Sequence, residues 1–164
     1  MSRATAPATL PWTEDDEANR LLASDANALL IGFALDQQVT VQKAFAGPLV
    51  LKQRLGHLDV GRIAAMPPDE LEAVFREKPA IHRFPGSMAG RVQALCGVIA
   101  DRYGGDGSRV WSEAATAADL VARLRELPGH PTLGDVDSAE ALAGYQEAKR
   151  AHKAKVRADK SRTG

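Results

Sequence analysis

Residues 27–38 read NALLIGFALDQQ, and this stretch decides the class of fold. Positions 29, 30, 31, 33 and 35 are large and apolar, so a helix here is apolar around its whole circumference. Such a helix runs through the middle of a core rather than along its surface. The stretch turns abruptly polar at Asp36, Gln37 and Gln38. We therefore predict a central, buried helix over residues 27–38 that ends in two glutamines.

The remaining sequence favours further helices around this one. Aromatic residues make up only 5% of the chain, and β-branched residues never alternate with polar ones over the length of a strand. The expected fold is therefore all-α, a compact multi-helix bundle. We predict helices over residues 13–24, 40–55, 88–103, 108–114 and 117–127, one that starts within 67–70, and a last one from Ser138.

Capping and helix-breaking residues set the expected ends of these helices. The Thr13 hydroxyl is expected to cap the first helix, and Gly56 and Gly104-Gly105 are expected to end two others. Gly47-Pro48 predicts a kink or an interruption within residues 40–55. Val121 is placed on the apolar face of the helix over 117–127.

The charge of the chain is zero overall but unevenly distributed. Lys+Arg and Asp+Glu both count 21 among the 164 residues, a length suited to one domain. Residues 149–164 carry seven basic residues and one acidic residue, a net charge of +6, so residues 1–148 carry −6. We divide the chain into a disordered lead-in (1–12), a helical domain (13–148) and a basic C-terminal helix or tail (149–164).

Several kinds of chemistry are excluded by composition. Cys96 is the only cysteine, so an intramolecular disulfide, a thiolate zinc site and a four-cysteine iron–sulfur cluster are ruled out. Its place on an apolar helix face predicts a buried, inert thiol. The histidines lie far apart in loops or in the tail and are expected to be exposed; they are His57, His82, His130 and His152. We expect no metal, no cofactor, no membrane span and an intracellular chain.

Three local features are less usual in a helical bundle. The first is Gln37-Gln38 between two helices, where the glutamines either serve a function or satisfy helix-end carbonyls and face water. The second is residues 83–91, a glycine-containing loop that opens a helix, whose amides suit a phosphate unless Ser87 is simply an N-cap. The third is residues 124–129, LRELPG, where an apolar helix end runs into Leu-Pro-Gly.

The order and spacing of these features resemble the helix-hairpin-helix base-excision DNA glycosylases. In that superfamily a buried helix ends in a segment similar to Gln37–Val41, a later helix carries a pattern similar to Arg91–Leu95, and Leu-Pro-Gly opens the hairpin. The resemblance covers residues 26–129. It is closest to the alkylpurine glycosylase branch, since the cysteines of the iron–sulfur branch are absent.

The resemblance implies a monomeric, cytoplasmic and nucleoid-associated DNA N-glycosylase that acts on double-stranded DNA with a damaged base. Such an enzyme rotates the nucleotide out of the helix and fills the gap with a side chain. The resemblance gives that wedge role to Gln37 or Gln38. The other DNA-binding residues that we expect are Ser87, Arg91, Pro128 and Gly129, together with Lys149, Arg150 and Lys153 of the tail. Aromatic candidates for base stacking, each with core packing as the alternative, are Phe33, Phe45, Phe84 and Trp111.

The chain departs from the family pattern after Gly129. It continues HPTLGDVDS, which leaves no room for the second helix of the hairpin. Asp135 and Asp137 are the candidate catalytic carboxylates, but they follow Gly129 by only six and eight residues. Either the chain carries a genuine deletion here or a segment is missing from it. If the protein is an enzyme, we expect a monofunctional glycosylase, because no lysine nucleophile can be assigned. The alternatives are a non-catalytic DNA-binding module and a helical bundle that binds other proteins.

Overall fold

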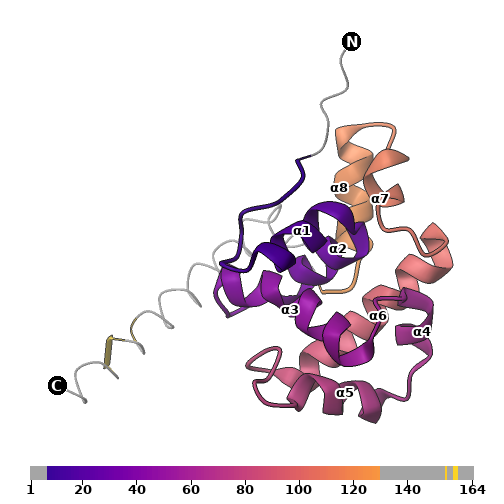
Figure 1. Ribbon diagram of the computed structural model, residues 1–164. Coiled ribbons are helices and arrows are strands. Elements are labelled where there is room, and N and C mark those ends of the chain that lie inside the picture. The colour runs from indigo at the N-terminus through magenta and orange to yellow at the C-terminus, as the bar shows by residue number, and fades with distance from the viewer. Residues whose placement is uncertain (1–6, 130–153, 155–156, 159–164) are drawn as a thin grey trace. The chain divides into compact units, whose positions relative to one another are not determined.

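The computed structural model describes residues 7–129, residue 154 and residues 157–158, and the first of these ranges is built from helices and their connections (Figure 1). The predicted all-α class is confirmed for this part of the chain, which contains no strand. The helices are α1 (Asp16–Ser24), α2 (Ala26–Leu35), α3 (Val41–Leu55), α4 (Val60–Ala65), α5 (Pro68–Arg76), α6 (Pro85–Tyr103), α7 (Arg109–Ser112) and α8 (Ala117–Glu126).

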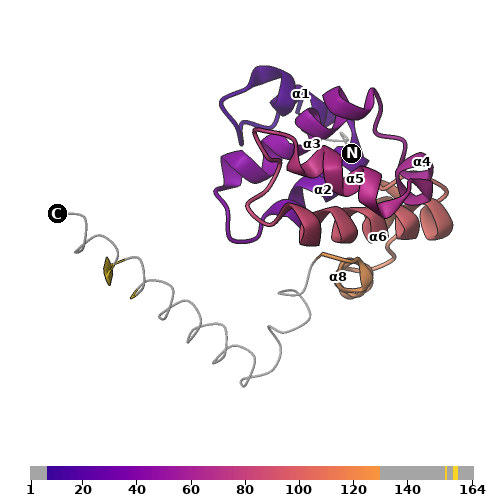
Figure 2. The same cartoon turned by 90° about the horizontal axis from the view of Figure 1, so that it is seen from below.

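Helix α2 is the predicted central helix. It packs against α1, α3 and α6, and all but four of its ten residues are buried (Figures 1 and 2). Two large apolar residues are exceptions: Leu29 is half-buried and Phe33 is 42% exposed. The helix ends at Leu35, three residues before the predicted end, because Asp36 adopts a non-helical backbone conformation. The two glutamines therefore lie in a connection between helices and not on α2.

Two glycines bring α2 and α3 close together. A Cβ on Gly32 would lie 2.5 Å from the Phe45 ring, and one on Gly47 would lie 2.5 Å from Leu35 Cδ1. The predicted interruption at Gly47-Pro48 is wrong, because α3 runs continuously from Val41 to Leu55 with Pro48 inside it. Pro48 costs the helix one backbone donor, while Gly47 provides the close contact with α2. Gly56 ends α3 as predicted, with φ 79°.

Helix α6 also contributes many residues to the core. Its predicted apolar face is buried, from Met88 through Cys96 to Tyr103, and α4 and α5 pack on it (Figure 2). It begins at Pro85, three residues earlier than predicted, because Pro fits the first helical turn, where no amide hydrogen is needed. Gly104 ends it in the left-handed region, as predicted.

The N-terminal end of the domain differs from the prediction in two ways. Asp15, not Thr13, caps α1, and its carboxylate accepts hydrogen bonds from two backbone amides of the first turn. The Thr13 hydroxyl donates instead to Asn19 Oδ1. Leu10 and Trp12, which the sequence assigns to the lead-in, pack against the core, and Trp12 contacts Phe45 edge-on at 4.8 Å. Packing against the core thus extends at least as far toward the N-terminus as Leu10.

Helices α7 and α8 follow the turn after α6. Leu120 and Leu124 pack against the core, whereas Val121 is 41% exposed, so its predicted place on the apolar face is wrong. Leu127, just after α8, is buried. Within the described residues, no helix is both long enough and apolar enough to cross a membrane. The helix predicted from Ser138 lies outside them.

Candidate functional site

The connection after α2 brings together residues from all three of the unusual sequence features. Arg91 on α6 donates to Gln37 Oε1 at 2.5 Å. Gln37 Nε2 donates to the carbonyl of Gly129 at 2.5 Å and to that of Ala34 at 3.1 Å. Gln37 is separated from Arg91 by 54 residues and from Gly129 by 92. One side chain therefore joins α2, α6 and the Leu-Pro-Gly segment, and its amide oxygen and nitrogen are both engaged.

The neighbouring Gln38 is placed quite differently. Its backbone has φ 58°, and no other non-glycine residue of the described chain has a positive φ. Its side chain is exposed and makes no hydrogen bond to the described part of the chain. Thr40 caps α3 two residues later, where its hydroxyl accepts from the Lys43 amide at 3.2 Å. The left-handed conformation costs a residue with a side chain about 1–2 kcal/mol.

His82 contradicts its predicted exposure, since only 1% of it is accessible. Its Nδ1 accepts a hydrogen bond from the Phe84 amide at 3.0 Å, so Nε2 carries the hydrogen. Nε2 donates to the carbonyls of Leu35 at 3.1 Å and Gln37 at 2.9 Å. Sequence reasoning missed this contact because the partners are backbone atoms 45 to 47 residues away. The one signal in the sequence was the apolar Ile81 beside it in a proline-bounded loop, and Ile81 is buried.

Burial of the His82 ring lowers its pKa from the usual value, and the positive charges of Arg83 and Lys43 lower it further. The hydrogen bonds to the carbonyls of Gln37 and Leu35 act in the opposite direction. Since desolvation has the largest effect, the imidazole is neutral at pH 7. This agrees with the hydrogen-bond pattern, because a protonated Nδ1 would place two donors against each other at the Phe84 amide.

Basic and apolar side chains surround the beginning of α6. The guanidinium of Arg83 lies 4.9 Å from the centre of the Phe84 ring, and Phe84 is 41% exposed. Phe84 is the N-cap and provides no side-chain bond, so Ser87, the exposed third residue of the helix, is not the N-cap. Lys43 Nζ donates to the Ala80 carbonyl at 2.6 Å. The first turn of α6 therefore has no side-chain cap. The ion pair of Arg76 and Glu72 lies against this turn, at Gly86.

The Leu-Pro-Gly segment packs tightly against the end of α2. Gly129 has φ 92°, and a Cβ on it would lie 2.9 Å from Ala34 Cβ. Only glycine fits such a position without displacement of the neighbouring helix. Pro128 and Gly129 are half-buried, and the Gly129 carbonyl points to Gln37.

Other predicted candidates are distributed elsewhere. Phe45 is buried and belongs to the core, while Phe33 and Trp111 are about two-fifths exposed. Burial raises the pKa of the Cys96 thiol to about 12, which confirms the predicted inert thiol. Within the described residues, no three His, Cys, Asp or Glu side chains form a group that could hold a metal ion. Asp135, Asp137, Lys149, Arg150 and Lys153 lie outside the described residues.

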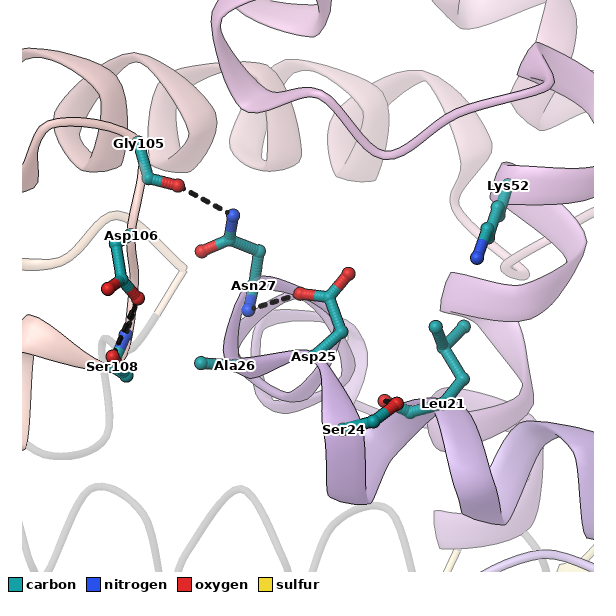
Figure 3. A pocket seen from close by; sticks show the side chains of 9 residues that line it. All are labelled: Leu21, Ser24, Asp25, Ala26, Asn27, Lys52, Gly105, Asp106 and Ser108. Carbon is teal, nitrogen blue, oxygen red and sulfur yellow. Dashed lines mark hydrogen bonds between the residues drawn. The ribbon is translucent and has the colours of Figure 1, made fainter.

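A polar depression at the opposite, N-terminal end of α2 has a structural explanation (Figure 3). Asn27 donates to the Gly105 carbonyl at 2.9 Å and accepts from the Gly107 amide at 2.7 Å, which ties α2 to the turn after α6. Asp25 caps α2. Hydrogen bonds from Ser108 lower the pKa of the Asp106 carboxyl. These polar groups are committed to caps and turns, so we place the candidate site at the other end of α2.

Comparison of the chain with protein-family models, with curated proteins and with solved structures found no match.

Proposed function

We propose that this chain is a base-excision repair protein, a DNA N-glycosylase that hydrolyses the N-glycosidic bond of a flipped, damaged base. The observation that carries this proposal is the meeting of Gln37, Arg91 and Gly129 at one connection. These residues belong to three separate motifs that resemble those of glycosylases. The contacts that join these motifs support a single site built from all three.

The structure gives the two glutamines different surroundings, and we assign them different roles, one structural and one as the wedge. Both functional atoms of the Gln37 amide are bound within the protein, so Gln37 supports the connection. Gln38 is exposed and held in a costly backbone conformation, and such conformations concentrate at functional sites. Gln38 is therefore the wedge of this proposal: its methylenes fill the gap in the base stack and its amide binds the orphaned base.

The surroundings of Gln38 suit a DNA backbone. Lys43 and Arg83 lie close enough to His82 for their charges to lower its pKa, and Arg91 binds Gln37 directly. The uncapped first turn of α6 offers amide donors to a phosphate. The half-exposed Phe84 ring adds an apolar surface at the same helix end. The chemical step in this proposal belongs to Asp135 or Asp137, as a carboxylate that stabilises the oxocarbenium-like sugar or orients water.

Binding is tested with three otherwise identical duplexes that are intact, carry an abasic-site analogue, or carry an alkylated base. We expect the wild type to prefer the abasic duplex in fluorescence anisotropy, because the gap needs no base flipping. Gln38→Ala should abolish the preference and keep most of the affinity for intact DNA. Gln53→Ala is the matched control, since Gln53 is an exposed glutamine on α3. If the wild type binds all three duplexes with equal affinity, Gln38 does not act as a wedge.

Catalysis is tested separately by base release from alkylated, deaminated and oxidised duplexes. We expect release from at least one substrate, with Asp135→Asn or Asp137→Asn abolishing it. The alternative function, a non-catalytic DNA-binding module, is favoured by the short spacing between Gly129 and these aspartates. Structure-selective binding without release from any substrate would establish that alternative.

A further inference from the structure

His82 has a place in this site that the motifs did not indicate. It is a buried polar side chain at the centre of the connection, and both of its ring nitrogens have partners. It belongs to the loop that opens α6, and its ring contacts the end of α2. Its bond to the Gln37 carbonyl links a titratable ring to the backbone next to Gln38.

That carbonyl belongs to the peptide unit that enters Gln38. The Gln37 carbonyl and the Gln38 amide form one rigid plane, so a bond to the oxygen orients the whole unit. The bond from His82 Nε2 at 2.9 Å holds this plane on one side of Gln38. On the other side the Thr40 cap fixes the beginning of α3. The reversal between these two anchors takes place at Gln38, which adopts φ 58°.

We propose that His82 is a positioning residue, which in its neutral form holds the Gln37–Gln38 peptide and thereby presents Gln38 to DNA. Protonation leaves the Nε2–H donor in place but sets a second N–H, at Nδ1, against the Phe84 amide hydrogen and puts a positive charge on a buried ring beside Arg83 and Lys43. The protonated ring therefore leaves this position, and its bond to the Gln37 carbonyl is lost with it. This inference rests on the proposed function for the role of Gln38. The link between His82 and the backbone of Gln38 is a property of the protein alone.

The charged groups around the imidazole set the direction of the pH dependence. Arg83 from its own loop and Lys43 from α3 both disfavour a positive ring, while the α2 end offers the uncharged carbonyls of Leu35 and Gln37. Arg91 from α6 reaches the same connection through Gln37. Since the folded pKa lies below the unfolded value of about 6.5, the stabilisation is fully present above that pH. It is lost as the pH falls through the lowered folded pKa.

His57 supplies a matched control within the same chain. Its Nδ1 accepts from the amide two residues later, Asp59, at 3.0 Å, as His82 Nδ1 does from Phe84. His57 is half-buried, and its ring makes no hydrogen bond to the α2 end. Substitution of His57 thus removes the same local turn contact without any effect on the Gln38 peptide.

The first test uses NMR spectroscopy of the full, DNA-free chain. At pH 7.5 the wild type should show the Nε2–H tautomer of His82 and a strong intraresidue amide-to-Hα contact for Gln38, the mark of a positive φ. Titration from pH 7.5 to a pH below the His82 transition, which is followed through the ring's own chemical shifts, should weaken that contact together with protonation of His82. His82→Gln, whose amide donates to the same carbonyls without titrating, should keep the contact at both pH values. His82→Leu should lose it at both, and His57→Leu should behave as the wild type.

The second test measures the preference for the abasic duplex over the intact one. Release of Gln38 from its conformation should lower the preference about fivefold to thirtyfold in His82→Leu, and in the wild type at a pH below the His82 transition. His82→Gln should keep the preference at both pH values.

The outcomes of the two tests decide the inference separately from the proposed function. If the amide-to-Hα contact of Gln38 changes neither with His82 titration nor with His82 substitution, the inference is overturned. If His82→Leu does not fold, the wild-type titration and His82→Gln decide. If the wild type lacks the preference but passes the NMR test, the wedge role of Gln38 in the proposed function fails, and the positioning of the Gln38 backbone by His82 stands.

Discussion

Substitution of Gln37 gives the sharpest measure of how the connection after α2 is held together. Gln37→Ala removes three hydrogen bonds: one from the charged Arg91 and two to the carbonyls of Ala34 and Gly129. Each of the two neutral bonds contributes about 1 kcal/mol to the free energy of unfolding. The bond from the charged Arg91 would contribute more if it were fully buried, but it is only partly buried, so its contribution is smaller. We expect a loss of about 2–3 kcal/mol in the free energy of unfolding. For a chain of this size that corresponds to a fall of roughly 5–10 °C in Tm.

Gln37→Glu distinguishes the contribution of the amide oxygen, which accepts from Arg91, from that of the amide nitrogen, which donates to two carbonyls. The carboxylate keeps an acceptor for Arg91 and adds a favourable charge, but it places an oxygen without a hydrogen against the carbonyls of Gly129 and Ala34. Because those carbonyls then lack a donor, we expect Gln37→Glu to be at least as unstable as Gln37→Ala. A geometry in which only the contact with Arg91 mattered would make Gln37→Glu as stable as the wild type.

The assay is urea denaturation followed by circular dichroism at pH 7.5. A double-mutant cycle with Arg91→Ala should give a coupling energy of about 1 kcal/mol between the two side chains. Gln53→Ala, at an exposed position on α3, is the control and should stay within about 0.5 kcal/mol of the wild type. A Gln37→Ala protein as stable as this control, or a coupling energy of zero, would refute the reasoning.

Three further predictions concern the neighbouring residues and the tail. Gln38→Gly should leave the chain as stable as the wild type or up to about 1 kcal/mol more stable, because glycine adopts φ 58° freely, yet it should lose the preference for the abasic duplex. Thermal melts and anisotropy measure the two effects, and a clear loss of stability would contradict the first. Gly129→Ala should cost about 1–3 kcal/mol in the free energy of unfolding, because of its φ of 92° and the contact with Ala34, whereas Gly90→Ala, which has open space on α6, should not. Deletion of residues 149–164 removes seven Lys and Arg and should reduce the slope of log affinity against log salt by about 0.9 for each phosphate that the tail neutralises; an unchanged slope would show that the tail does not bind DNA.

The fold class and the core were predictable because they depend on local patterns. The apolar run of α2 and the spacing of Met88, Val92 and Cys96 on α6 need no knowledge of distant residues. The ends of α3 and α6 at Gly56 and Gly104 were also predictable, because a glycine that ends a helix is a local signal. The errors arose where tertiary contacts outweigh such patterns. Pro48 stays inside α3 because the helix is held by packing against α2, which propensity does not measure.

The candidate site was only partly predictable for the same reason. The sequence singles out Gln37, Arg91 and Gly129 separately, but it does not indicate that one amide joins them. It predicts an exposed His82, because a histidine in a proline-bounded loop carries no periodic signal. The burial of His82 depends on two backbone carbonyls at the end of α2. Every residue has a backbone carbonyl, so the sequence does not indicate which ones bind a distant side chain. Sequence reasoning therefore found the residues that resemble a motif and missed the one that holds the backbone.

The contrast between Gln37 and Gln38 bears on the proposed role of Gln38 as a wedge. A connection that served only to join α2 and α3 would need Gln37, whose amide satisfies the carbonyls of Ala34 and Gly129. At the next position, a left-handed conformation in an exposed turn favours Gly or Asn over Gln. Gln38 instead bears a strain of about 1–2 kcal/mol, and its exposed side chain makes no hydrogen bond within the described part of the chain to offset it. A residue that lowers stability in this way is best explained by a contact outside the free protein, which is what insertion into DNA would provide.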